Sequence, residues 1–134
     1  MSHLFRVSAR DHSAVVLMAE LARLQKDDFA SLKDIAKTMH LSEGYLEEIA
    51  ASLKKAKLIE GKQGPRGGYR LAKKADQINL ADILTALDGP IEIVDCQKGA
   101  GCPVASMCTS KNIWKQVQKG IEETLSQTKL VDVV

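Results

Sequence analysis

Residues 31–71 constrain the fold of this chain most, because two short helical patterns joined by a tight turn lead directly into a glycine-rich hairpin pattern. The first pattern begins at Ser31, which with Asp34 has the form of a capping box, and ends before His40. The second begins at Ser42 as N-cap. Apolar residues recur at positions i, i+3, i+4 and i+7 in both predicted helices: Leu32, Ile35, Ala36 and Met39, then Leu46, Ile49, Ala50 and Leu53.

A hairpin with a basic tip is predicted after the second helix. Strand-like runs at 58–60 and 69–71 flank residues 61–68, whose sequence Gly-Lys-Gln-Gly-Pro-Arg-Gly-Gly is rich in turn formers. In a winged helix-turn-helix, the second helix of such a pair enters the major groove of DNA and the hairpin reaches phosphates or the minor groove. The sequence therefore predicts a mainly α fold, a winged helix-turn-helix with a small β-hairpin wing.

The distribution of charge agrees with binding to double-stranded promoter DNA, although the net charge of +2 is too small to argue for it alone. Residues 54–74 contain eight Lys or Arg and one acid, whereas residues 75–108 contain five acids and one Lys. Polar groups that could meet base edges are Ser42, Glu43, Tyr45 and Glu47. Basic groups that could bind phosphates are Lys54, Lys55, Lys57, Lys62, Arg66 and Arg70. The alternative is a basic face that is merely solvated.

Three further helices are predicted outside residues 31–71. One covers residues 11–26, and another begins at Asn79 and stops at 88–90, because proline cannot continue a helix. The last begins at Thr109 or Ser110 and carries an apolar stripe at every fourth residue: Ile113, Val117, Ile121 and Leu125. A long C-terminal helix with an unpartnered stripe is a natural dimerisation element, so we expect a homodimer. The alternative is that this helix packs on its own domain.

Three cysteines predict a metal centre. Cys96, Cys102 and Cys108 are separated by five residues each time, in a loop at 91–108 whose glycines let the backbone bend tightly. Thiolates are the usual iron-sulfur ligands, whereas a structural zinc site normally shows tighter Cys-x2-Cys pairing and four ligands close in sequence. An iron-sulfur cluster is therefore preferred over zinc or three reduced thiols. One ligand position remains, and His12 is the best histidine for it.

The length of 134 residues fits one ordinary domain, or one small domain with an appended helix and loop. We divide the chain into a DNA-binding domain at 1–76 and a segment at 77–134 that holds the cysteine loop and the dimerisation helix. A cytoplasmic protein without a membrane partner is expected, because no apolar run could cross a bilayer and no signal-peptide pattern is present. An enzyme with a small-molecule substrate is not expected, since no cysteine has a motif that supplies a base.

Along nearly its whole length the sequence resembles the IscR/NsrR family of dimeric winged-helix regulators. The matching stretches are 41–47, the wing at 64–71, the segment at 78–91, and the evenly spaced cysteines followed by Trp114. The resemblance is closest to regulators of iron-sulfur cluster assembly, with the nitric-oxide-sensing branch as the nearest rival. It implies that the three cysteines ligate the cluster, that Ser42, Tyr45 and Glu47 read bases, and that the last helix pairs two subunits.

Two departures from that family concern the fourth ligand and the wing. Lys111 stands where IscR has its ligating histidine, and the ligating aspartate of the nitric-oxide branch falls at His12, with Asp11 adjacent. A His12 ligand would resemble the 2Fe-2S arrangement, which we prefer, and an Asp11 ligand the 4Fe-4S one. Gln63 stands where IscR has a wing arginine, with Arg66 three positions further on, so Gln63 joins the candidate DNA contacts.

The predicted function is that of a transcription regulator that senses iron-sulfur status, redox state or nitric oxide through its cluster. One alternative is a cluster-free, thiol-based regulator of the same fold. Another is an iron-sulfur carrier or electron-transfer protein, which would need the cysteines but not the basic hairpin.

Overall fold

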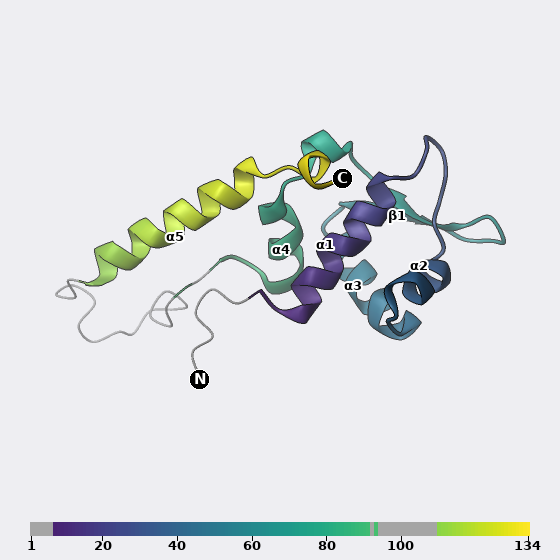
Figure 1. The fold of residues 1–134 in the computed structure, drawn as a ribbon, viewed down its shortest axis with the longest axis horizontal. Helices are drawn as coiled ribbons and strands as arrows, with labels where there is room; N and C mark the ends of the chain where they lie inside the picture. Colours follow the sequence, from purple (N-terminus) through teal and green to yellow (C-terminus); the bar gives the residue numbers. More distant parts are fainter. Residues whose placement is uncertain (1–6, 92, 94–109) are drawn as a thin grey trace.

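A computed structural model of the chain describes residues 7–91, 93 and 110–134. Most of these residues form helices, and one antiparallel hairpin extends from the helical body (Figure 1). The elements are α1 (Ala9–Ala22), α2 (Leu32–Met39), α3 (Glu43–Lys55), β1 (Ile59–Lys62), β2 (Gly68–Leu71), the short 3-10 helix η1 (Ala75–Gln77), α4 (Leu80–Asp88), α5 (Ser110–Gln127) and the 3-10 helix η3 (Leu130–Val133). The predicted mainly α fold with a β-hairpin wing is confirmed.

Side-chain caps fix the start of most helices. The Ser42 hydroxyl accepts a hydrogen bond from the backbone N–H of Tyr45 at 3.1 Å, as predicted for the start of α3. Asn79 and Asp82 form a full capping box at the start of α4. Ser31 occupies the N-cap position of α2, but its side chain makes no capping bond, so the predicted capping box is wrong. The backbone just before Ser31 is held instead by a bridge to the hairpin.

This bridge places one residue of the α1–α2 loop, Ala30, beside β2 as a third extended segment, which the sequence patterns did not predict. Ala30 and Tyr69 exchange two backbone hydrogen bonds, with N···O distances of 2.9 and 2.8 Å. The loop between α1 and α2 therefore pairs with β2, on the side away from β1. This pairing also explains why α1 ends at Ala22 rather than at Lys26: the chain turns through Asp27, at a φ of 70°, and returns in extended form.

The hydrophobic core draws on both halves of the chain. Its largest fully buried side chains are Leu17, Met18, Leu46, Ile49, Leu53, Ile59, Ile78, Ile83 and Leu130. Leu130 comes from η3, after the long helix α5, and its backbone N–H donates to the Ile78 carbonyl at 2.8 Å. The core thus contains residues from both sides of the predicted division at residue 76, and that division stays a prediction.

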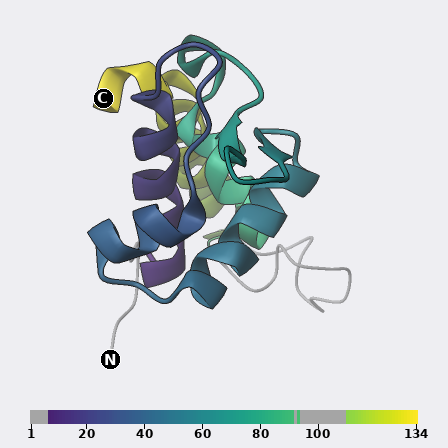
Figure 2. The same ribbon diagram turned by 90° about the vertical axis from the view of Figure 1, so that its right-hand side faces the viewer.

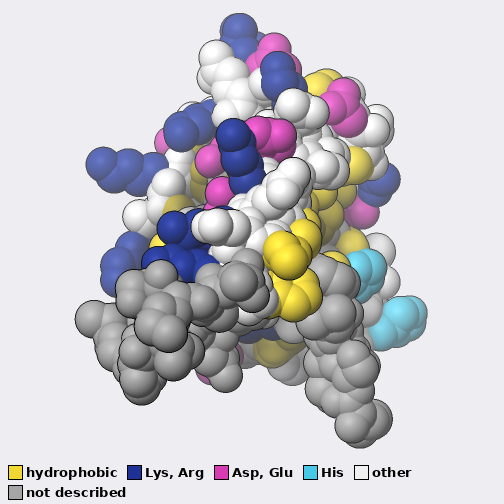
Figure 3. Space-filling model, turned by 90° about the vertical axis from the view of Figure 1, so that its left-hand side faces the viewer, with side chains coloured by type: hydrophobic (Ala, Val, Ile, Leu, Met, Phe, Trp, Pro, Cys, Tyr) yellow, Lys and Arg dark blue, Asp and Glu magenta, His cyan; other side chains and the backbone are white. Residues whose placement is uncertain are grey.

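The long helix α5 begins far from the helical body and ends beside it (Figure 1). None of its residues is buried, and Ile113 near its start is 58% exposed. In Figure 3, which looks onto this end of the molecule, hydrophobic side chains reach the surface beside lysine and arginine side chains. Among the described helices, none is long and apolar enough to cross a membrane.

Candidate DNA-binding surface and metal-ligand residues

Helices α2 and α3 and the hairpin lie on one side of the molecule, which faces the viewer in Figure 2. Tight backbone turns set this arrangement. His40 between α2 and α3 adopts a φ of 56°, and Lys57 between α3 and β1 adopts a φ of 63°. In both turns the next residue donates back into the helix, as Leu58 does to the Leu53 carbonyl at 3.0 Å. Each helix therefore ends in a turn of only a few residues, which leads from α2 into α3 and from α3 into β1.

The predicted base-reading residues divide into exposed and packed ones. Glu43 and Glu47 on α3 are exposed, and together with Gly64 and Gly67 of the hairpin they line one open groove. Tyr45 is half-buried and packs against the core, so part of its ring has a structural role. The groove between α3 and the hairpin is thus bordered by carboxylates, which can accept hydrogen bonds from cytosine amino groups.

The predicted phosphate-binding residues and the predicted wing contact Gln63 also differ from one another. Lys54 and Lys55 are exposed at the end of α3, and Gln63 and Arg66 are exposed in the hairpin loop. Arg70 on β2 is half-buried and already paired with carboxylates within the chain. Lys57 is exposed too, and the exposed Lys62 lies with its ammonium 5.6 Å from the centre of the Phe29 ring. Of the six predicted basic groups, Arg70 is the one that forms ion pairs within the part of the chain that the structure describes.

A pair of carboxyl groups lies where the start of α1 meets the end of α4. A hydrogen bond with Asp11 raises the pKa of Asp88 above its ordinary value, and burial and the negative charge of Asp11 act in the same direction, whereas Arg10 opposes them. Asp11 also has one buried oxygen, Oδ1, with no hydrogen-bond partner among the described atoms. Arg10 donates to the Ser52 hydroxyl of α3 at 3.4 Å. Sequence patterns did not identify Asp88, because nothing local marks its contact with Asp11.

Only some of the candidate cluster ligands are among the described residues. Cys96, Cys102 and Cys108 lie outside the described residues, whereas His12 is exposed on α1. Asp88, beside Asp11, is the last residue of α4 and precedes the predicted cysteine loop by three positions. Within the described ranges, no three His, Cys, Asp or Glu side chains are grouped to hold a metal ion.

Comparison with known proteins identifies the family. Residues 7–134 match the Rrf2 family, described as an iron-dependent transcriptional regulator. The HTH-type transcriptional regulator IscR of Yersinia pestis is 30% identical over 129 residues, which cover 96% of this chain and 79% of that protein.

Solved structures agree with the sequence match. The structure of T. potens IscR is similar with a TM-score of 0.77 and 34% identity, over 96% of this chain and 85% of that one. The structure of CymR, the global cysteine regulator of B. subtilis, has a TM-score of 0.76 and 30% identity, over 96% of this chain and 95% of that one. These relatives are regulators rather than enzymes, as predicted. The chain belongs to the Rrf2 family of transcriptional regulators.

Proposed function

We propose that this Rrf2-family regulator binds promoter DNA with an affinity that depends on an iron-sulfur cluster held by Cys96, Cys102 and Cys108. The main support for this proposal is the equal spacing of three cysteines between α4 and α5 in the sequence, in a family described as iron-dependent. When bound, the cluster supplies a group that oxidants, nitric oxide or iron shortage can alter or remove. The chain's own residues then translate that change into DNA affinity.

The fourth ligand is proposed at the start of α1, where the residues fit such a group. The buried Asp11 Oδ1, which has no hydrogen-bond partner within the described part of the chain, supports a carboxylate ligand, since an acceptor oxygen that burial has removed from water gains from a cation. His12 is the alternative, and its exposed ring on the same turn is open to a partner subunit. The Asp11 ligand corresponds to the 4Fe-4S form and the His12 ligand to the 2Fe-2S form preferred from sequence.

The DNA contacts are proposed on the face shared by α3 and the hairpin. Base readers are Ser42, Glu43, Tyr45 and Glu47, and wing contacts are Gln63 and Arg66. Lys54 and Lys55 supply phosphate contacts that bind without reading sequence. The open groove between α3 and the hairpin loop supports this assignment.

The dimer is proposed to form along α5. Its apolar stripe lies on a helix without a buried residue, and Ile113 is the most exposed member. Two such helices from two copies would cover each other's stripes. The recognition helices of the two copies would then bind two half-sites of one operator.

The coupling between cluster and DNA is proposed to pass through α4. The predicted cysteine loop follows the end of α4 in the sequence, and η3 beyond α5 is bonded through Leu130 to Ile78, two residues before α4 begins. Ordering or releasing the loop would shift α4 and the partner subunit, and so the separation of the recognition helices. A coupling of about 1–3 kcal/mol is enough for a useful switch.

The test uses protein purified without oxygen. We expect visible absorption with stoichiometric iron and sulfide, and we expect operator affinity or sequence preference to differ between the holo protein and both the apo protein and a Cys102→Ala variant. Equal affinities and equal sequence preference in all three would end the cluster-sensing proposal. Failure of even the holo protein to bind a duplex from its own promoter at modest ionic strength would remove the DNA contacts as well.

A thiol-based regulator without a cluster is the second candidate. The similarity to CymR, named the global cysteine regulator of B. subtilis, covers as much of this chain as the similarity to IscR does. A colourless, iron-free preparation from anaerobic cells that still binds its operator would favour this candidate. Iron and sulfide in that preparation would favour the cluster.

A further inference from the structure

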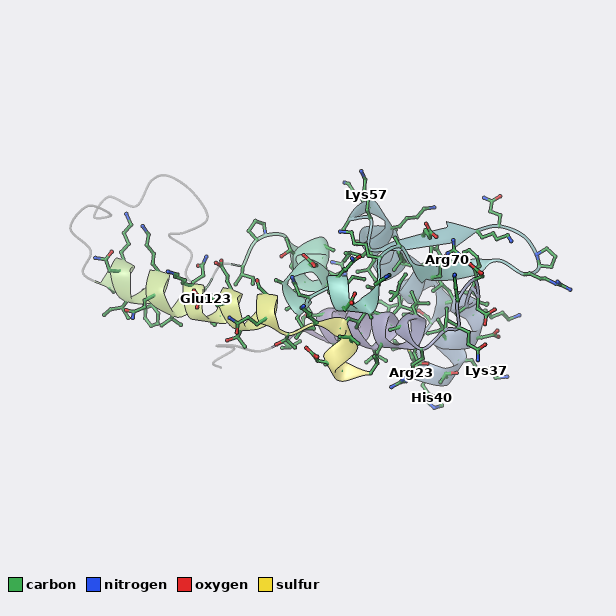
Figure 4. All side chains as sticks on the ribbon, turned by 90° about the horizontal axis from the view of Figure 1, so that it is seen from above. Arg23, Lys37, His40, Lys57, Arg70 and Glu123 are labelled. Carbon is green, nitrogen blue, oxygen red and sulfur yellow. The ribbon has the colours of Figure 1, made fainter. Side chains whose placement is uncertain are left out.

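Arg70 connects the hairpin to the loop that leads into α2. Its Nε donates to the Glu60 carboxylate across the two strands at 2.6 Å, and its terminal nitrogen lies 3.8 Å from the Asp27 carboxylate. Its guanidinium carbon lies 4.5 Å from the centre of the Phe29 ring, within cation–π range. In Figure 4, Arg70 is labelled where the strands leave the helical body. Arg70, on β2, thus contacts Glu60 on β1 as well as Asp27 and Phe29 in the loop between α1 and α2.

Further contacts act on the same junction. The Lys62 ammonium lies 5.6 Å from the Phe29 ring centre, so the ring has a cation from each strand. Next to Phe29, Ala30 exchanges backbone hydrogen bonds with Tyr69. The base of the hairpin is therefore attached to the α1–α2 loop by main-chain and side-chain contacts together.

The charge around Arg70 argues against a phosphate contact. Arg70 faces two carboxylates, Glu60 and Asp27, whose side chains are 48% and 81% exposed. With Lys62, which lies over the same Phe29 ring, the four side chains carry no net charge, so this junction offers a phosphate no net attraction. Arg66, in contrast, is exposed in the loop and has no ion pair among the described residues. The two arginines of the hairpin therefore have different surroundings.

We infer that Arg70 is a positioning residue, which sets the angle of the hairpin relative to α3 by clamping it to Phe29, and that it does not bind DNA itself. This inference rests on the proposed DNA-binding surface. A rigid clamp lets Arg66 and the hairpin loop meet the DNA without an ordering cost at binding. Loosening the clamp should weaken binding while every phosphate contact remains available.

The experiment measures operator affinity against salt concentration for four proteins: wild type, Arg70→Gln, Phe29→Leu and the matched control Arg66→Gln. Because the slope of log affinity against log salt counts phosphate contacts, Arg66→Gln should reduce its magnitude by about 1. Arg70→Gln and Phe29→Leu should each weaken binding roughly tenfold with the slope unchanged, an ordering penalty of ordinary size. A fifth protein that combines Arg70→Gln with Phe29→Leu should bind no more weakly than Arg70→Gln alone, because both changes release the same clamp.

A conservative variant separates charge from geometry. Arg70→Lys keeps the positive charge but loses the planar guanidinium, so it should bind as weakly as Arg70→Gln. Recovery of wild-type affinity by lysine, or a slope reduced by about 1 in Arg70→Gln, would show a direct phosphate contact and overturn the inference. Wild-type affinity in both Arg70→Gln and Phe29→Leu would overturn it too.

Two other outcomes can be told apart from a wrong role for Arg70: a variant that does not fold, and a DNA-binding surface that is wrongly assigned. If thermal unfolding shows that Arg70→Gln does not fold, Phe29→Leu and Glu60→Gln take its place with the same expected slope. Absence of any salt-dependent operator binding by the wild-type protein would instead remove the proposed DNA-binding surface.

Discussion

Gly68 is the residue at which the hairpin meets the α1–α2 loop most tightly. Its φ is 143°, and an added Cβ would lie 2.2 Å from the Ala30 carbonyl oxygen. We expect Gly68→Ala to lower the free energy of unfolding by at least about 2 kcal/mol, since strain and a backbone clash act together. Gly120→Ala is the matched control: a Cβ there meets no described atom within 4 Å, and alanine should raise helix stability by roughly 0.5–1 kcal/mol. Urea unfolding of both variants measures the difference, and equal midpoints would contradict the clash.

Asp88 makes stability depend on pH. Its pKa is raised in the folded state, chiefly by the hydrogen bond with Asp11, so the folded protein holds the proton more tightly than the unfolded chain. The contact of Asp88 with Asp11 therefore stabilises the folded state at acid pH. This contribution is lost as the pH rises from 3.8, the ordinary pKa of an aspartate, through the raised pKa of Asp88. We expect Asp88→Asn to melt higher than wild type at pH 7 and at nearly the same temperature at the acid end.

The Asp88 measurement uses apo protein, so that Asp11 has no metal to bind. Glu123→Gln on the exposed part of α5, labelled in Figure 4, is the control and should follow the wild-type profile. An Asp88→Asn melting temperature that runs parallel to wild type at every pH would contradict the carboxyl contact.

At the scale of elements, η3 attaches the end of α5 to α4. The Leu130 side chain is fully buried, its backbone N–H donates to the Ile78 carbonyl, and the Thr128 carbonyl accepts from the backbone N–H of Leu80. We expect Leu130→Ala to cost roughly 2–5 kcal/mol, the usual range for a leucine removed from a packed core. Val133→Ala in the same element should change stability by less than about 0.5 kcal/mol, because Val133 is 45% exposed. Similar losses in both variants, measured by calorimetry, would mean that η3 does not carry the attachment.

At the scale of the whole molecule, α5 carries an apolar stripe although none of its residues is buried, and Ile113 is the exposed member of that stripe. Ile113→Glu should convert the proposed dimer to a monomer with little change in helix content, because a charge placed between two apolar stripes is desolvated without a partner. Lys115→Gln changes the net charge by the same amount on the opposite side of α5 and should leave the dimer intact. Sedimentation velocity reads the mass directly, and an unchanged mass for Ile113→Glu would exclude this helix face from the interface.

The elements that depend on near neighbours were predictable. Ser42 and Asn79 act as caps through atoms three residues away, and the apolar repeats of α2 and α3 reflect only the helical period. Ser31 failed as a capping box although its local pattern was correct, because a distant strand fixes the backbone before it. The candidate site was predictable to the same extent. Residue type and position identified Arg70 as a basic residue of the hairpin, but they did not predict its ion pairs with Asp27 and Glu60.

By itself the sequence determined the order of helices and hairpin, the three thiols between the last two helices, and the basic stretch at 54–74. Each of these depends on residue type and on spacing along the chain. Only the tertiary structure decided that Ala30 pairs with Tyr69, that Leu130 returns to the core, that Asp11 meets Asp88, and that Arg70 faces Phe29 and two carboxylates. These contacts join segments far apart in the chain, and their partners are set by packing of the whole core, which no local period encodes.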